Sequence, residues 1–111
     1  MLGFNHAFRG VLNMLRTERN FKIQFVLLLF TIIIGIVLKI SLQEWIAIVI
    51  SSCLVFGFEI INSAIEKTCD LISEDENSQI KWIKDVSAGA VLIICIGAVI
   101  VGCLIFIPYF Y

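Results

Sequence analysis

Four polar side chains with chemical potential lie in one largely apolar stretch, F58-E-I-I-N-S-A-I-E-K-T-C-D70: Glu59, Asn62, Glu66 and Asp70. An α-helix turns by about 100° per residue, so these positions fall within about 80° of one another and form a polar stripe. An ionisable side chain at membrane depth costs about 2.5–3.5 kcal/mol on insertion scales and usually faces a bundle interior or a functional path. Carboxylates in this setting suit proton transfer or binding of a hard cation.

Further charged residues are expected near the inner end of this stripe. Glu66 lies about 10 Å beyond Glu59 along the helix axis, toward the second loop. Glu18 directly precedes the first apolar run, and if that end of the run lies on the same side of the membrane, Glu18 is at about the same depth as Glu66. Two carboxylates meeting there, with Lys84 and Asp85 nearby, suit oxygen ligation of Mg²⁺ that carries phosphates. Alternatively, these residues form only interhelical hydrogen bonds and salt bridges and hold no metal ion.

The elements that hold these residues are predicted to be membrane helices. Of the 111 residues, 60% are hydrophobic, and few water-soluble domains reach this content because polar residues must cover their outside. The formal net charge of −1 provides no basic field that would attract nucleic acid. We therefore expect an all-α membrane protein with one domain, residues 1–111.

The hydropathy pattern predicts one surface helix and three membrane spans. Residues of about 3–17 form an amphipathic pattern, which suits a helix in the membrane interface with its arginines toward the lipid headgroups. The spans are expected at about 19–39, 45–72 and 84–107, each long enough to cross a hydrocarbon core of about 30 Å. The polar stripe lies in the inner half of the second span.

Basic residues indicate the orientation in the membrane. The first loop contains only Lys39. Arg9, Arg16, Arg19 and Lys22 precede the first span or lie at its start, and Lys67, Lys81 and Lys84 surround the second loop. By the positive-inside rule, the N-terminus and the 73–85 loop are expected in the cytoplasm and the C-terminus outside.

Several familiar catalytic motifs are missing from the sequence. It has no G-x-x-x-x-G-K-[ST] loop and no kinase glycine-rich loop, so a nucleotide site must be built in another way. The four cysteines have neither CxxC nor Cys/His metal spacing, which favours small apolar residues over disulfides or a zinc site. His6 is the only histidine, which excludes a zinc-hydrolase cluster.

Two motifs carry a resemblance to a known family. The run E59-I-I-N-S-A-I-E66-x-x-x-D70, followed by K84-D-V-S-A-G-A-V91, resembles the signature of the small prokaryotic integral-membrane diacylglycerol kinases, whose Gram-positive relatives phosphorylate undecaprenol. The segments A7-F-R-G-V and T17-E-R-N-F21 are also similar to that family. The resemblance covers essentially the whole chain and is stronger toward the Gram-positive branch.

The resemblance implies an ATP-dependent lipid kinase that works as a homotrimer, with active sites shared between neighbouring three-span subunits. Carried over by position, Glu59 would be the general base, and Glu18 and Glu66 would hold the Mg²⁺ that bridges the ATP phosphates. Arg9 and Glu59 would bind the lipid, and Asp70 would support the site. The implied nucleotide contacts are Glu18, Asn62, Glu66, Asp75, Asn77, Lys84, Asp85 and His6.

The sequence departs from the family pattern at two expected nucleotide contacts. The family commonly has an E-Y-H-like element where this chain reads D75-E76-N77, and an aromatic residue often stands at the place of His6. The acceptor lipid also stays open between undecaprenol and diacylglycerol, which would yield phosphatidic acid, because both present a primary hydroxyl at the membrane interface.

Two other classes of membrane protein are compatible with a small chain that carries a membrane glutamate. A small multidrug-type transporter expects four spans, and a proton-carrying ring subunit normally has two spans and one essential carboxylate. The combined set of Glu59, Asn62, Glu66, Lys84 and Asp85 exceeds what either class needs. The sequence therefore favours the lipid kinase.

Overall fold

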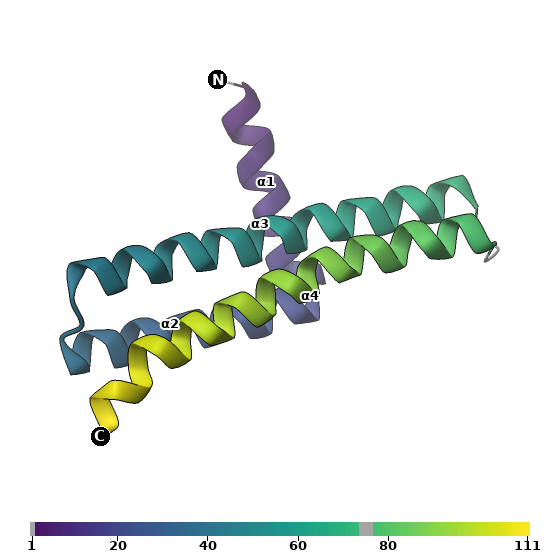
Figure 1. The fold of residues 1–111 in the computed structure, drawn as a ribbon. Coiled ribbons are helices and arrows are strands. Elements are labelled where there is room, and N and C mark those ends of the chain that lie inside the picture. Colours follow the sequence, from purple (N-terminus) through teal and green to yellow (C-terminus); the bar gives the residue numbers. More distant parts are fainter. Residues whose placement is uncertain (1, 74–76) are drawn as a thin grey trace. The chain divides into compact units, whose positions relative to one another are not determined.

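The computed structural model, which describes residues 2–73 and 77–111, is helical throughout that part of the chain (Figure 1). Its elements in chain order are α1 (Leu2–Thr17), α2 (Arg19–Leu38), α3 (Leu42–Ile72), α4 (Ser78–Phe106) and the short 3₁₀ helix η1 (Ile107–Phe110). In the described part, three helical segments are long and apolar enough to cross a membrane: Arg19–Leu38, Leu42–Ile72 and Ser78–Phe110. The predicted all-α class with three candidate spans is confirmed.

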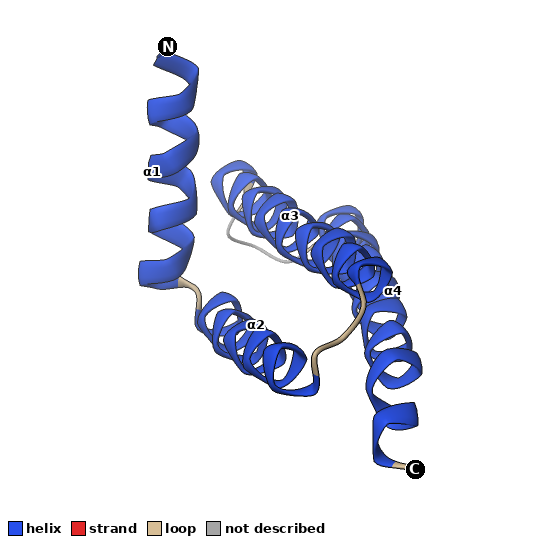
Figure 2. Ribbon diagram, turned by 90° about the vertical axis from the view of Figure 1, so that its left-hand side faces the viewer, coloured by secondary structure: helices blue, strands red, loops and turns tan. Residues whose placement is uncertain are grey.

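The chain forms two compact units, and the first of them, Met1–Lys39, contains α1 and α2. Glu18 separates the two helices in an extended conformation, with φ −97° and ψ 114°, and the chain changes direction there (Figure 2). Lys39 closes α2 in the left-handed region, with φ 54°. This conformation lets its backbone N–H donate to the carbonyls of Gly35 and Ile36, which a helix C-terminus otherwise leaves without partners.

Helix α3 begins at Leu42, earlier than the predicted start at about 45, because Ser41 and Glu44 form a capping box. The backbone N–H of Glu44 donates to Ser41 Oγ at 3.2 Å, and the backbone N–H of Ser41 donates to Glu44 Oε1 at 2.9 Å. These reciprocal bonds satisfy two backbone donors at the helix start.

Helix α4 begins at Ser78, and the predicted start of the third span at about 84 lies well inside it. Asn77 caps the helix, since its side-chain oxygen accepts a hydrogen bond from the backbone N–H of Ile80 at 2.9 Å. The connection that was expected to span 73–85 is therefore shorter, and Lys84 and Asp85 are helical residues.

The second unit, Ile40–Tyr111, is built around α3 and α4, which lie side by side as an antiparallel pair (Figures 1 and 2). Residues of reduced exposure recur along both helices at alternating steps of three and four, which is the spacing of a coiled-coil seam. We call these positions the α3–α4 seam. They are Ile48, Ser52, Val55, Glu59, Asn62, Glu66 and Cys69 on α3, and Ile80, Lys84, Ser87, Val91, Ile94, Ala98, Val101 and Ile105 on α4.

The seam is apolar toward one end and polar toward the other. Its apolar part packs residues such as Val55 and Ile94, whereas the part nearer the 73–77 connection contains the polar residues of α3 and, on α4, Lys84 and Ser87. All seam residues are buried or half-buried except Glu66, which is exposed. The polar stripe seen in the sequence is therefore largely an interhelical stripe.

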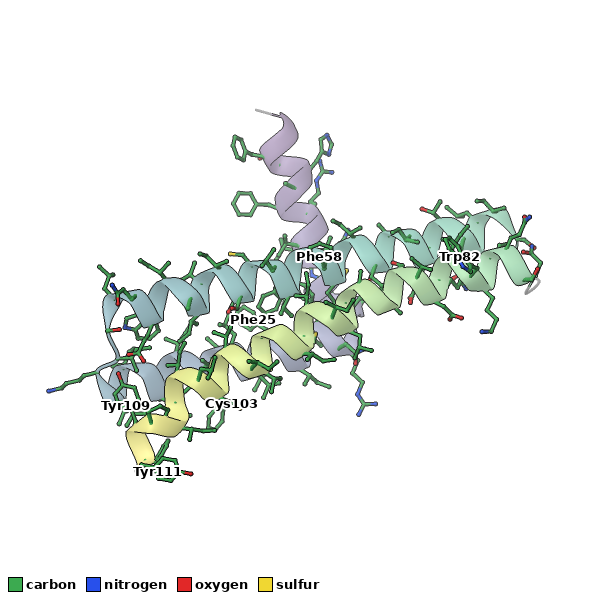
Figure 3. The ribbon with its side chains drawn as sticks, in the orientation of Figure 1. Phe25, Phe58, Trp82, Cys103, Tyr109 and Tyr111 are labelled. Atoms are coloured by element: carbon green, nitrogen blue, oxygen red, sulfur yellow. The ribbon has the colours of Figure 1, made fainter. Side chains whose placement is uncertain are left out.

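A hydrogen bond joins η1 to the start of α3. The phenol of Tyr109 donates to Glu44 Oε1 at 2.5 Å, the same oxygen that accepts the Ser41 N–H. Tyr109 and Tyr111 lie at this end of the second unit, and Trp82 lies toward the opposite end of the α3–α4 pair (Figure 3). The capping box and η1 therefore share one carboxylate.

Removing the phenol hydroxyl should loosen η1 alone. For Tyr109→Phe in lipid nanodiscs we expect faster amide hydrogen exchange over residues 107–110 and unchanged protection along the α3–α4 seam, because only the bond to Glu44 is lost. Tyr111→Phe is the matched control, since Tyr111 is fully exposed at 101%. Equal exchange at 107–110 in both variants would show that the bond does not hold η1.

Candidate functional site

Two polar side chains are buried on α3 within the described residues, Glu59 at 8% exposure and Asn62 at 9%. Both lie on the α3–α4 seam, one helical turn apart. The hydroxyl of Ser87, on α4, donates to Asn62 Oδ1 at 2.7 Å. The deepest part of the polar stripe thus combines a buried carboxylate with an amide that is fixed from the neighbouring helix.

A second cross-helix contact lies nearer the 73–77 connection. Lys84 Nζ donates to Asp70 Oδ1 at 2.7 Å, with the lysine side chain 34% exposed and the aspartate side chain 64% exposed. An ion pair this exposed contributes little to stability, so its main effect is to fix the position of the ammonium group. A lysine has three N–H donors, and the two not used by Asp70 can bind an anion.

The side chain of Asp85 points to a different side of α4 from that of Lys84. It accepts a hydrogen bond from Lys81 Nζ at 2.8 Å, an exposed i,i+4 pair within α4. Consecutive helical residues are turned by about 100° from each other, so Lys84 faces α3 while Asp85 does not. The two residues of the K84-D85 motif therefore act on different sides of α4.

Glu66 occupies the stripe between these two contacts and is exposed. In the parts of the chain that the structure describes, no three His, Cys, Asp or Glu side chains gather into a group able to hold a metal ion. Mg²⁺ bound to a nucleotide needs only one or two protein carboxylates, because phosphates and water supply its remaining ligands. An accessible carboxylate such as Glu66 fits this type of magnesium site.

The remaining predicted site residues of α1 and α2 belong to the first compact unit. Arg9 Nη2 contacts His6 Nδ1 at 2.8 Å. Because a guanidinium can only donate, His6 Nδ1 is the acceptor in this contact. The sequence assigned His6 and Arg9 to different ligands, whereas the structure makes them direct partners. Glu18 is exposed at the α1–α2 junction, and its approach to Glu66 stays a prediction.

Of the two nucleotide contacts predicted in the 73–77 segment, Asp75 and Asn77, the structure describes only Asn77. Asp75 lies outside the described residues. Asn77 is exposed and caps α4 through its side-chain oxygen, which leaves its amide N–H groups as the donors for a ligand.

Ser87 is the site residue that the sequence reasoning missed. In the sequence it stands only inside the motif K84-D-V-S-A-G-A-V91, where the resemblance implies no role for it. The available clue was its helical spacing, because Ser87 follows Lys84 by three residues and therefore shares its face. The hydroxyl could have been paired with the polar stripe on that basis.

The exposure of these carboxylates increases along α3, from the buried Glu59 to the exposed Glu66. The buried carboxylate of Glu59 can accept a proton from a hydroxyl that enters from the lipid side. The accessible carboxylate of Glu66 and the ammonium of Lys84 can bind a cation and an anion at the more exposed end of the stripe. This order suits the transfer of a phosphate from a water-soluble donor to a lipid.

The chain is similar in sequence to known lipid kinases. Residues 5–106 match the family described as prokaryotic diacylglycerol kinase. The chain is 38% identical over 105 residues to undecaprenol kinase of Bacillus subtilis, which covers 95% of this chain and 85% of that protein. It is 33% identical over 109 residues to diacylglycerol kinase of Synechocystis sp., which covers 97% of this chain and 62% of that protein.

Proposed function

Because the chain belongs to the prokaryotic diacylglycerol kinase family, we propose that it transfers the γ-phosphate of ATP to the hydroxyl of a membrane lipid, and that this lipid is undecaprenol. The observation that carries the proposal is the polar half of the α3–α4 seam, where Glu59, Asn62 and Lys84 lie along one helix pair able to cross a membrane. The higher identity to the relative named for undecaprenol supports this choice of lipid.

Glu59 is the proposed general base. As the lipid hydroxyl oxygen forms its bond to the γ-phosphorus, its proton passes to the Glu59 carboxylate, the bond from the γ-phosphorus to the bridging oxygen breaks, and ADP leaves. Phosphoryl transfer depends chiefly on positioning and charge stabilisation. The seam position of Glu59 supports this role, because burial between helices holds its carboxylate in place.

The ATP phosphates are proposed to bind at the more exposed end of the stripe. Glu66, together with Glu18, would hold Mg²⁺, which when bound neutralises charge on the phosphates. Lys84, fixed by Asp70, would direct its free N–H groups to a phosphate oxygen. Further nucleotide contacts are proposed for His6, Asn62, Asp75, Asn77 and Asp85.

The proposed assembly is a homotrimer whose active sites are shared between neighbouring subunits. Each subunit is one kinase domain, residues 1–111, in which α1 is an amphipathic surface helix and Arg9 lies at the lipid entrance. Charge supports an orientation with the N-terminus and the 73–85 segment in the cytoplasm and the C-terminus outside. A small multidrug-type transporter is not favoured, since the described residues provide three candidate spans and that class needs four.

The choice of lipid is tested by comparing turnover of the two substrates in separate reactions. Purified protein is given Mg-ATP with undecaprenol or diacylglycerol at equal mole fraction in mixed micelles, and phosphorylated lipid and ADP are both measured. We expect faster turnover of undecaprenol. Faster turnover of diacylglycerol would support the alternative substrate, for which one relative is named. Absence of transfer to either alcohol would overturn the lipid kinase.

A further inference from the structure

The hydrogen bond between Ser87 and Asn62 points to a role for Ser87, a residue of α4 to which the family resemblance assigned none. We infer that Ser87 is a positioning residue that holds the Asn62 amide with its N–H groups, and not its oxygen, toward the phosphoryl group in transfer. The inference rests on the proposed function and deepens it. It also implies that Asn62 is not a ligand of the magnesium ion.

The first support is the direction of the hydrogen bond. The Ser87 hydroxyl donates to Asn62 Oδ1 at 2.7 Å, so the carbonyl end of the amide is already engaged. An asparagine side chain offers one oxygen acceptor and two N–H donors. With Oδ1 bound to Ser87, the amide presents its donors to a ligand, whereas Mg²⁺ takes oxygen ligands.

The second support is that the Ser87 hydroxyl does not bond to a backbone carbonyl of its own helix, which is the usual partner of a hydroxyl in a helix. Thr17, Thr31 and Thr68 each donate to the backbone carbonyl four residues earlier in their own helices, at 2.7, 2.9 and 2.7 Å. Ser87 instead donates across the seam to another helix. Because such back-bonding is always locally available to a helical serine, the cross-helix bond indicates a fit between these two side chains.

The third support is burial. Asn62 is only 9% exposed and Ser87 is half-buried. If the amide flipped, Oδ1 would lose the donor it has, and a buried polar atom without a partner is unfavourable. A flipped amide could still donate to the Ser87 oxygen, so the observed orientation is distinguished by the donor that it gives to Oδ1.

The position of Asn62 identifies what its donors meet. It follows Glu59 by three residues and precedes Glu66 by four, so all three occupy one helical face. A phosphoryl group in transfer between a nucleotide held at Glu66 and an alcohol activated at Glu59 would lie between these two carboxylates, at the level of Asn62. Donors fixed at this point stabilise negative charge on the phosphoryl oxygens in the transition state.

The kinetic test uses Ser87→Ala, with Ser87→Thr as the conservative variant that keeps a hydroxyl. For Ser87→Ala we expect kcat to fall about 10- to 100-fold, less than the 100- to 1000-fold typical of removing a transition-state donor itself, with KM for Mg-ATP and the Mg²⁺ dependence unchanged. Ser87→Thr should recover most of kcat. Ser52→Ala is the matched control, because it makes the same change at another half-buried seam position and should retain wild-type kcat.

A second measurement separates this inference from the proposed function. In ¹⁵N-labelled protein without substrates, the side-chain N–H₂ resonances of Asn62 should shift in Ser87→Ala and not in Ser52→Ala. A shift with no lipid phosphorylation by the wild-type protein would refute the kinase while keeping the hydrogen bond. Unchanged resonances, wild-type kcat in Ser87→Ala, or a raised Mg²⁺ requirement would each overturn the positioning role in an active kinase.

Discussion

Replacing Glu59 with glutamine should abolish phosphate transfer while leaving Mg-ATP binding largely intact. Glutamine keeps the size of the side chain and can still form hydrogen bonds at the seam, but it cannot take up the proton of a hydroxyl. Loss of a general base typically costs about 10²- to 10⁴-fold in rate. Because Glu59 is buried at 8% exposure, no water is expected to replace it efficiently.

Two measurements on the same preparation check this expectation. Lipid phosphorylation is followed with radiolabelled ATP, and equilibrium binding of Mg-ATP is measured without the lipid. The dissociation constant should stay within about twofold of wild type while transfer is lost. Glu59→Asp, which retains a carboxylate at a shorter reach, should keep measurable activity. A matching loss of nucleotide binding in Glu59→Gln would place Glu59 in the nucleotide site instead.

Replacing Glu66 with glutamine should have the opposite profile. Glu66 is the exposed carboxylate of the seam, and the amide oxygen of glutamine carries no charge to attract a divalent cation. Loss of even an outer-shell partner typically weakens metal affinity by about 10- to 100-fold, so we expect Mg-ATP binding to weaken at least tenfold. Added Mg²⁺ should restore part of the activity of this variant and none of that of Glu59→Gln.

The comparison of the two variants is the decisive part. Both substitutions exchange a carboxylate for an amide of similar size on the same helical face, about 10 Å apart along the axis. If Glu59→Gln and Glu66→Gln alter nucleotide binding equally, the division of roles along α3 is wrong. A magnesium titration of both proteins in parallel distinguishes the cases.

Much of the fold could be predicted from local sequence patterns, chiefly the length of the apolar runs. Apolar runs of sufficient length predict spans whatever their neighbours, because the hydrocarbon core sets the length. Helices α3 and α4 begin before the predicted membrane spans for a local reason as well: Ser41, Glu44 and Asn77 are polar caps that hydropathy excludes from a span. The capping box S41-L-Q-E44 follows a recognisable sequence rule, so that boundary was available to a closer reading.

The candidate site could be predicted in its residue types but only partly in its contacts. The polar stripe of Glu59, Asn62 and Glu66 follows from the helical repeat. Which residue of α4 faces each of them depends on the register of two helices that are distant in sequence. The pairing of Asn62 with Ser87 and of Asp70 with Lys84 is a property of that register.

The sequence by itself thus determined an all-helical membrane chain, its polar stripe and its family. Only the tertiary structure decided that the stripe lies largely in the α3–α4 seam, that Lys84 is paired with Asp70 while Asp85 is paired with Lys81, and that Ser87 donates a hydrogen bond to Asn62. The physical reason is the distance along the sequence over which each effect acts. Hydropathy and helix periodicity act within a few turns of one helix, whereas the partner of a buried polar group is chosen by how two packed helices align.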